Sequence, residues 1–350
     1  MSVYLRSGIV SPFVTSFSTP EWLLRSLLDE ILDRSELPLG EVDTVFVATN
    51  TVLNERITEH FHEDQVPFVT VNSPRCPVGR ALYLAHRLMV SAEVSTVAII
   101  TVSIPDRSLL RTLQREGDNL AQQFSLDRNT LDDWSFQSAE RYVRHTKAAV
   151  SFPWSYLLVE PTTGITHIQD TLLGHVLTRE TLTEMNLIFP EPYTVVTEGN
   201  TARPAVGGGA ILLSKERDGA LLELEAIEHG HAGQKLASLS SLMALPHLLS
   251  GLEKLAGYGI PEWTASHVLS MLRLMRNDTF CESYLGLKNC LMESSDHVNP
   301  PGGDLAYGWA PGPAEMRHLL TFPVSSGERF ILLLNDVPGQ GFALRAKSLS

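Results

Sequence analysis

The sequence predicts an α/β fold built from several layers, because helical and strand patterns alternate along it. Apolar side chains recur at helical spacing over residues 22–32, and a β-branched run follows at 42–49. Each half of the chain contains a strand, a turn, a helix and a second strand in the same order, although no clear repeat of residues is visible. Alternating strands and helices pack as α/β layers, and the shared order is consistent with a duplicated fold.

A turn between a strand and a helix carries Cys76. The apolar run at 66–71 leads into this turn, the pattern at 81–90 is helical, and residues 94–102 have the composition of a buried strand. At a helix start, the positive end of the dipole and free backbone N–H groups stabilise a thiolate. That environment suits a nucleophile that accepts an acyl group. The alternative is an inert buried thiol, because free cysteine is among the most buried residue types.

Residues 105–192 differ from their surroundings. This stretch is charged, helical in pattern and punctuated by prolines, and it lacks the buried strand runs of its neighbours. We interpret it as an inserted helical loop subdomain. The first half of the fold then comprises residues 1–104 and 193–216, and the second half comprises residues 217–350.

The rest of the chain alternates in the same way. Strand patterns are expected at 193–196, 210–213, 221–227, 330–335 and 342–346. Helical patterns are expected at 239–255 and 314–320, and a short apolar stretch lies at 267–274. Three glycines, Gly207, Gly208 and Gly209, precede one strand without the spacing of a phosphate-binding loop, so close packing of the strand explains them better.

Composition excludes several classes of protein. Of the 350 residues, 43% are apolar and 19% are charged, and the formal charge of −13 repels the phosphate backbone of nucleic acids. No apolar run is long enough to span a membrane and no charged-then-apolar leader is visible, so we expect a cytoplasmic protein. Cys76, Cys281 and Cys290 form no CxxC pair, which fits neither a disulfide framework nor a zinc site. The expected chemistry is that of a free thiol, without a metal.

Six segments, in the right order, resemble motifs of the thiolase superfamily. Residues 70–72 with Cys76 and Gly79 resemble the nucleophile segment TVNxxCxSG, with one extra residue before the cysteine. The other similarities are 115–121, 125–128 and 134–138 to MGxTAENLA…SREEQD…ALRSHQ, 197–214 to TAGNxSxxxDGAAAxLL, 277–280 to NEAF, 298–310 to VNxxGGAIxxGHP, and 339–341 to the end of CxGGGQG. The resemblance implies a five-layered α-β-α-β-α thiolase-like fold of two similar halves with an inserted loop subdomain.

Two catalytic positions of that family are altered here. The resemblance implies that family members use the first cysteine, here Cys76, as acyl acceptor, a histidine to activate it, and a second cysteine to move the α-proton of the substrate. Trp309 stands at the histidine position and Asn335 at the second cysteine. Tryptophan only donates a hydrogen bond, so Trp309 would fill or line the pocket. Asn277, in the NEAF-like segment, would hold a water or a thioester carbonyl; the alternative is a loop-capping asparagine.

A replacement base has to be sought among the histidines. The candidates are His297 before the glycine loop, His318 on the following helix, and the pair His229 and His231. A single histidine is more often a packing or surface residue than a catalyst. A His-x-His pair can bind a metal, but no third ligand is indicated.

Arg107, Arg111 and Arg115 are spaced by four and would line one side of a helix. In an acidic protein, such a row would hold the phosphates of CoA or of a phosphopantetheine arm. The alternative is a solvated helix face.

These observations favour an acyltransferase of secondary or lipid metabolism. Cys76 would take an acyl group from an acyl-CoA or acyl-carrier-protein thioester and pass it to an acceptor, without a permanently bound cofactor. Asn335 cannot abstract a proton, so ordinary thiolase activity is not expected. The alternative is a catalytically inactive thiolase-like subunit of a heteromeric condensing enzyme. The resemblance also implies a homodimer, or a heterodimer with another thiolase-like protein.

Overall fold

The structure is a computed structural model that describes residues 2–17, 20–51, 66–148, 155–171, 177–250, 252, 255–287, 297–322 and 324–349. Within these ranges, the strands of the main sheet are β1 (Val3–Val10), β2 (Thr44–Thr49), β3 (Phe68–Asn72), β4 (Thr96–Ser103), β7 (Gly207–Ser214), β8 (Leu222–His231), β9 (Gly257–Gly259), β10 (Arg329–Asn335) and β11 (Gln340–Ser348). A separate hairpin pairs β5 (Leu158–Val159) with β6 (Thr166–His167).

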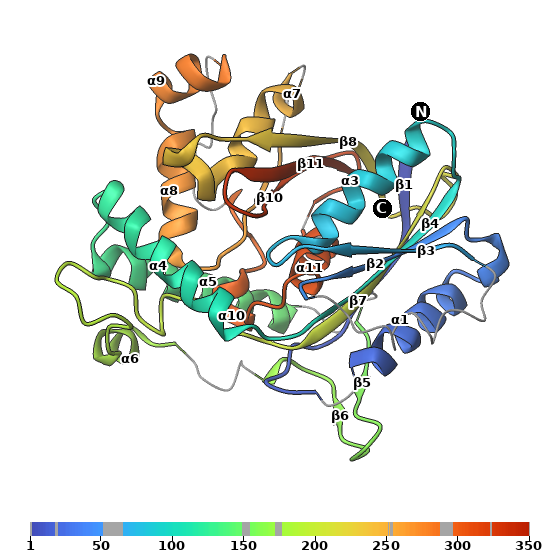
Figure 1. The fold of residues 1–350 in the computed structure, drawn as a ribbon, viewed down its shortest axis with the longest axis horizontal. Coiled ribbons are helices and arrows are strands. Elements are labelled where there is room, and N and C mark those ends of the chain that lie inside the picture. The colour runs from blue at the N-terminus through green and yellow to red at the C-terminus, as the bar shows by residue number, and fades with distance from the viewer. Residues whose placement is uncertain are drawn as a thin grey trace.

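The helices cover this sheet and lie beside it (Figure 1). They are α1 (Pro20–Arg34), α3 (Pro77–Val90), α4 (Arg107–Gln123), α5 (Arg128–Ala148), α6 (Arg179–Glu184), α7 (Leu245–Leu249), α8 (Ala265–Met275), α9 (Asp278–Phe280), α10 (Asp304–Tyr307), α11 (Pro313–Thr321) and the shorter or tighter turns η1 (Leu39–Glu41), η3 (Gln234–Ala244) and η4 (Cys281–Leu285). In the part of the chain that the structure describes, no helix is both long and apolar enough to cross a membrane.

The strands follow the order β3-β2-β4-β7-β1-β8-β11-β10-β9. The first five strands lie within residues 1–104 and 193–216, and the last four lie within residues 217–350. The antiparallel pairing of β1 with β8 joins the two sets. Helices α3 and α11 contact strands of both sets, so they form a middle layer. Helix α1 packs on β4 and β7, whereas η3 and α7 pack on β8 and β11.

Neighbouring residues on a strand show that these helices lie on opposite faces. On β7, a side chain at Gly208 would meet Leu27 of α1, whereas one at Gly209 would meet Met316 of α11. On β11, Gly341 faces Ser241 of η3, whereas the ring of the next residue, Phe342, lies against that of Tyr83 on α3. Successive residues of a strand point to opposite faces. The layer order is therefore α-β-α-β-α, as the resemblance implied.

The glycines of β7 have a steric reason. A Cβ atom at Gly208 would lie 2.6 Å from Leu27, and one at Gly209 would lie 2.9 Å from the sulfur of Met316. Both distances are shorter than ordinary van der Waals contact. The close packing that the sequence predicted at 207–209 is thus the approach of helices from both faces of the strand.

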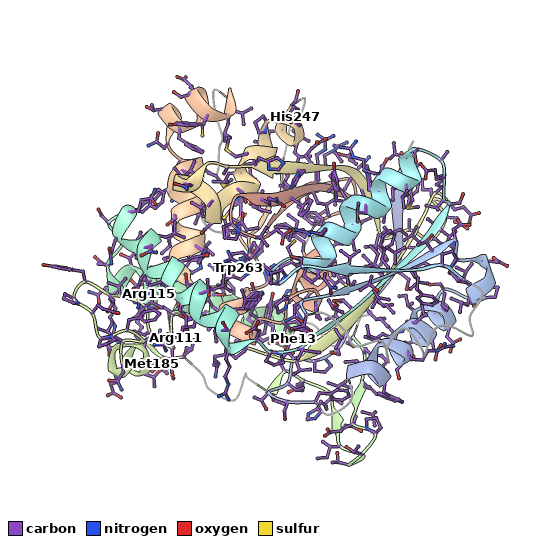
Figure 2. The ribbon with its side chains drawn as sticks, viewed as in Figure 1. Phe13, Arg111, Arg115, Met185, His247 and Trp263 are labelled. Atoms are coloured by element: carbon purple, nitrogen blue, oxygen red, sulfur yellow. The ribbon has the colours of Figure 1, made fainter. Side chains whose placement is uncertain are left out.

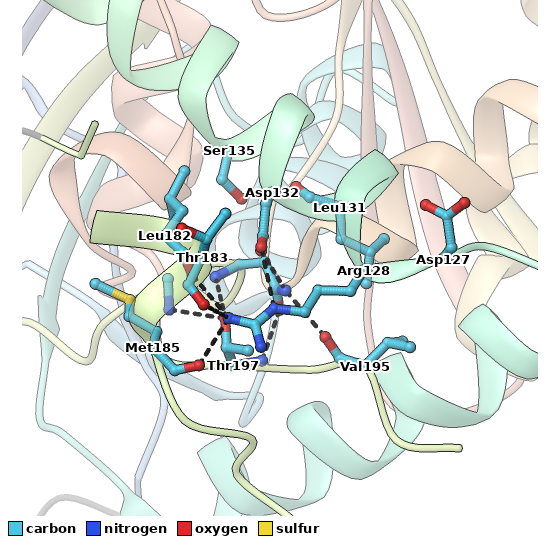
Figure 3. A network of polar contacts seen from close by, with 12 residues as sticks. Asp127, Arg128, Leu131, Asp132, Ser135, Leu182, Thr183, Met185, Val195 and Thr197 are labelled. Atoms are coloured by element: carbon cyan, nitrogen blue, oxygen red, sulfur yellow. Dashed lines mark hydrogen bonds and ion pairs between the residues drawn. The ribbon is translucent and has the colours of Figure 1, made fainter. Parts of the chain in front are cut away.

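The region at 105–192 contains α4, α5, α6 and the β5–β6 hairpin. Helices α4 and α5 pack against α8, and α5 also contacts α10. Figure 3 shows how Arg128, at the start of α5, holds the end of α6: its Nη2 donates to the carbonyls of Leu182, Thr183 and Met185 at 2.8, 3.0 and 2.7 Å. This region is mainly helical, as the sequence predicted.

Two sequence predictions of local structure are wrong. Residues 193–196 form no strand, because the carboxylate of Asp118 accepts the backbone N–H groups of Val195 and Val196 at 2.9 and 3.1 Å. The expected long helix at 239–255 is instead η3 followed by the short α7, with Pro246 in the first turn of α7. Proline has no N–H to donate, so it begins a helix well and continues one badly.

A buried ion pair connects the middle layer to the inserted region. Arg317 of α11 donates to both carboxylate oxygens of Asp170 at 2.7 and 3.0 Å and to the carbonyl of Ser11 at 3.0 Å. The same carboxylate accepts the backbone N–H of Phe13 at 2.6 Å and the hydroxyl of Tyr142 at 2.5 Å. Four segments that are distant in sequence therefore depend on one buried carboxylate and one guanidinium.

Replacing Arg317 by methionine should destabilise the protein by about 3–5 kcal/mol, because it leaves the Asp170 carboxylate buried without its cation. Urea denaturation measures this change. The matched control is Arg6→Met, whose pair with Glu216 is exposed and 3.4 Å long, and whose loss should cost about 0–1 kcal/mol. Equal stabilities of the two variants would contradict the account.

Candidate active site at Cys76

Cys76 lies where the sequence placed it, between a strand and a helix. Strand β3 ends at Asn72, and Cys76 is the N-cap of α3, with Pro77 in the first turn. The side chain is 1% exposed. A side chain at Gly79 would collide with the Cys76 sulfur, so this glycine makes room for the thiol.

A buried carboxylate lies against this thiol. The Sγ atom of Cys76 is 3.4 Å from Oε2 of Glu315, in the first turn of α11. The same oxygen accepts the backbone N–H of Gly79 at 2.6 Å, and Oε1 accepts that of Gly312 at 3.0 Å. Gly312 has a φ of +95°, and a side chain there would meet Thr101 of β4. The N-termini of α3 and α11 thus meet at one carboxyl group.

This arrangement changes the expected state of the thiol. Burial raises the pKa of Cys76 well above 9.0, and the negative charges of Glu315 and Asp336 raise it further. Burial likewise raises the pKa of Glu315 to about 8, although its two backbone hydrogen bonds oppose the shift. The expected thiolate at the helix start is therefore wrong. The helix N–H groups are present, but Gly79 donates to Glu315, whose charge disfavours a second anion beside it.

Asp336 closes the other side of the site. Its Oδ1 accepts the hydroxyl of Ser73, and its Oδ2 accepts two hydrogen bonds from Arg80 at 3.0 and 2.5 Å. The backbone N–H of Cys76 donates to the Ser73 oxygen at 3.2 Å. The amide that would face a thioester oxygen therefore already has a partner within the protein.

Asn335 is buried beside this cluster at the end of β10. Its Oδ1 accepts hydrogen bonds from the backbone N–H and the hydroxyl of Ser241 at 3.0 and 2.7 Å. Its Nδ2 lies 3.6 Å from the sulfur of Met271 on α8. An amide held at both ends is a structural group, and it has no proton to exchange near neutral pH.

Trp309 is also buried, and it belongs to the same neighbourhood. Its ring centroid is 6.0 Å from that of Trp263, and the guanidinium carbon of Arg75 is 5.5 Å from the Trp263 ring. Arg75 directly precedes Cys76. Trp309 is thus connected to the residue before Cys76 through Trp263 and shows no direct contact with the sulfur among the described interactions.

Asn277 does not join them. It is exposed, and its side chain caps α9 by accepting the backbone N–H of Phe280 at 2.8 Å. The structure therefore contradicts the expected role of Asn277 in holding a water or a thioester carbonyl and agrees with the alternative, a capping asparagine. The NEAF-like letters fall on a surface helix start after α8, where an asparagine serves as a cap.

None of the candidate histidines forms a described hydrogen bond with Cys76, although the charges of Asp336 and Arg80 act on His229. His297 is exposed. His318 is buried on α11, but its Nε2 lies 3.1 Å from the hydroxyl of Tyr307 and 3.3 Å from Asp304. His229 and His231 lie on β8 with their rings edge to face, 4.2 Å apart between centroids. In the described ranges, no group of three or more metal-ligating side chains is gathered to hold a metal ion.

The arginine row on α4 is partly neutralised. Arg107 and Arg111 are exposed, whereas Arg115 pairs with Glu191 at 2.9 Å. Arg111 and Arg115 both lie over the ring of Phe189, at 5.0 and 3.8 Å from its centroid. Figure 2 shows where these two arginines lie. Binding of phosphate groups by this row stays a prediction.

Sequence reasoning missed Glu315 and His267. The search for a base considered only histidines, whereas Glu315 was visible as an acidic residue in the first turn of a helix after a glycine loop. His267 is buried on α8, with Nδ1 2.8 Å from Thr264 and Nε2 3.8 Å from Glu116, which in turn pairs with Arg75. Its place beside the site depends on tertiary packing and has no motif.

The fold of the chain is similar to that of solved thiolases. The Acat5 thiolase of Ascaris suum, solved in complex with coenzyme A, is 17% identical, and the match covers 100% of both chains with a TM-score of 0.81. The acetyl-CoA acetyltransferase of Bacillus anthracis is 17% identical over 99% of each chain, with a TM-score of 0.81. The dimeric peroxisomal thiolase of Saccharomyces cerevisiae is 17% identical over 99% of this chain and 97% of its own, with a TM-score of 0.79. No protein-family model and no curated protein matches the sequence.

The raised pKa of Glu315 predicts a pH-dependent loss of stability. The unfolded chain ionises this carboxyl near pH 4.5, whereas the folded chain keeps it protonated up to about pH 8. Its contribution to stability is therefore full below pH 4.5 and is lost as the pH rises to about 8, by at most about 1.4 kcal/mol per pH unit. The free energy of unfolding of the wild type, minus that of Glu315→Gln, should fall across this window. Parallel curves would contradict the assignment.

Proposed function

We propose, from the premise that the chain has the thiolase fold over its whole length, that it is an acyltransferase that carries its acyl group on Cys76. One observation carries the proposal. Three segments that are distant in sequence, bearing Ser73, Asp336 and Glu315, meet beside Cys76 at the start of the central helix α3. A cysteine sulfur held in this position is placed to attack a thioester carbonyl.

The same site argues against ordinary thiolase chemistry. Carbon–carbon bond formation or cleavage next to a thioester needs a base for the α-proton, with a pKa matched to the task. The side chain of Asn335 is not such a base, and Ser241 and Met271 hold both ends of its amide. Transfer of an acyl group to an oxygen, nitrogen or sulfur acceptor needs no α-proton to be removed.

The donor is proposed to be an acyl-CoA or an acyl-carrier-protein thioester. The Ascaris suum thiolase of the same fold was solved with coenzyme A, which supports CoA as a ligand of this chain. The exposed Arg107 and Arg111 of α4 are the proposed contacts for its phosphates. A dimer, with a second copy or with another thiolase-like protein, is proposed from the dimeric yeast enzyme.

A second function has its own supporting observation. Cys76 is 1% exposed, its pKa is raised, and its backbone N–H is already bonded to Ser73. A thiol in this state suits a catalytically inactive thiolase-like subunit that shapes the active site of a condensing enzyme. Loss of a partner enzyme's activity on omission of this chain, with Cys76→Ala as effective as the wild type, would establish that function.

The acyltransferase proposal predicts a covalent adduct. After incubation with acetyl-, hexanoyl- or lauroyl-CoA, intact mass spectrometry should show one acyl group on the wild type, mapped to the peptide that contains Cys76. Cys76→Ala should show none, and thiolysis of acetoacetyl-CoA should stay at the background rate. Cys281→Ala is the matched control, because Cys281 is also a buried free cysteine and its sulfur donates to backbone carbonyls of α8. An adduct that persists in Cys76→Ala would rule out the proposed nucleophile.

A further inference from the structure

We infer that Glu315 is the catalytic base of this site: its carboxylate takes the proton of the Cys76 thiol during acylation and returns it to the leaving group. This inference rests on the proposed function. It assigns the role of the base to a carboxylate, whereas the sequence analysis named only histidines as candidates.

The geometry of the pair carries the inference. Oε2 of Glu315 lies 3.4 Å from Sγ of Cys76, within reach of a hydrogen bond from a thiol, and both side chains are buried. Gly79 and Gly312 donate their N–H groups to the two carboxylate oxygens and fix their orientation. The base is thus positioned by two helix starts rather than by a flexible loop.

The site would activate its cysteine through a neighbouring carboxylate base rather than as a preformed thiolate. A preformed thiolate is disfavoured here, because the buried sulfur faces two carboxylates. An ordinary carboxylate is a weak base for a thiol, but burial raises the pKa of Glu315 to about 8 and so strengthens it. Proton transfer and attack on the thioester then occur together.

The steps balance in protons and bonds. The Cys76 proton moves to Glu315 as the sulfur attacks the thioester carbonyl, the bond from that carbon to the donor sulfur breaks, and the donor thiolate takes the proton from Glu315. In the second half, Glu315 accepts the proton of the acceptor hydroxyl, amine or thiol as it attacks the acyl group. Cys76 leaves as a thiolate and regains that proton.

The charged groups around the pair are few. From the end of β10 it faces Asp336, which is bonded to Arg80 of α3 and whose charge also acts on His229 of β8. From its own helix, Arg317 is engaged by Asp170, and His318 by Asp304. The packing partners Thr101 of β4 and Gly209 of β7 bring no charge. The pH dependence of acylation should therefore follow Glu315.

The test measures two reactions of Cys76 in the wild type and in Glu315→Gln: acylation by the acyl-CoA of the panel that reacts fastest, and alkylation by iodoacetamide. Glutamine cannot accept the proton, so acylation should slow by about 100-fold or more. Glutamine also removes a negative charge beside the sulfur, so alkylation, which needs only the thiolate, should stay equal or become faster. A purely structural role of Glu315 would move both rates in the same direction.

Two further variants serve as controls in the acylation assay. Glu315→Asp retains a carboxylate and should recover part of the acylation rate, and Glu225→Gln, which loses a partner of Arg329 and Arg345, should acylate at the wild-type rate. If Glu315→Gln does not fold, the wild-type acylation rate must itself rise with an apparent pKa of about 8. Undiminished acylation in folded Glu315→Gln, or a wild-type rate that rises only above pH 9, overturns the inference alone. A wild type that is alkylated at Cys76 but acylated by no donor overturns the proposed function, and the inference with it.

Discussion

The carboxyl group of Glu315 accepts backbone N–H groups from the starts of two helices, and the chemistry of the site depends on that contact. Gly79 of α3 and Gly312 of α11 both donate to it, so each helix directs the positive end of its dipole toward the same point. The N–H groups of the two helix starts are therefore used by Glu315 and not by the sulfur of Cys76. The sulfur remains a thiol, and the neighbouring carboxylate becomes the group with a pKa suited to proton transfer.

The five layers make this contact possible. Helices α3 and α11 contact strands of both sets, which brings their starts together. Cys76 and Glu315 therefore meet although they are 239 residues apart in sequence. The close approach of helices to β7 requires the small residues Gly208 and Gly209. Buried polar groups near the site are bonded to one another: Ser73 and Arg80 to Asp336, and Asn335 to Ser241. Such a connected network favours one fixed geometry over several loose ones.

The sequence predicted the layered fold because strand and helix periodicities are local properties. The strands predicted at 42–49, 94–102 and 330–335 from their own residues are β2, β4 and β10 of the structure. It failed at 193–196, where the decisive partner, Asp118, is distant in the chain. It failed in the same way at Asn277, since a motif of four letters does not say whether a helix start faces the core or solvent. Cys76 was placed correctly, but its ionisation was not, because the charge beside it comes from the other half of the fold.

The titration of the Glu315 carboxyl group is the most direct test of this account. Carbon-13 NMR of the protein labelled at glutamate carboxyl carbons, with the signal assigned by its loss in Glu315→Gln, reports the ionisation of this group in the folded state. The account predicts a midpoint near pH 8 that shifts in Cys76→Ala, because the sulfur is its hydrogen-bond partner. A midpoint near 4.5, unchanged by Cys76→Ala, would show that the carboxyl is solvated and apart from the thiol.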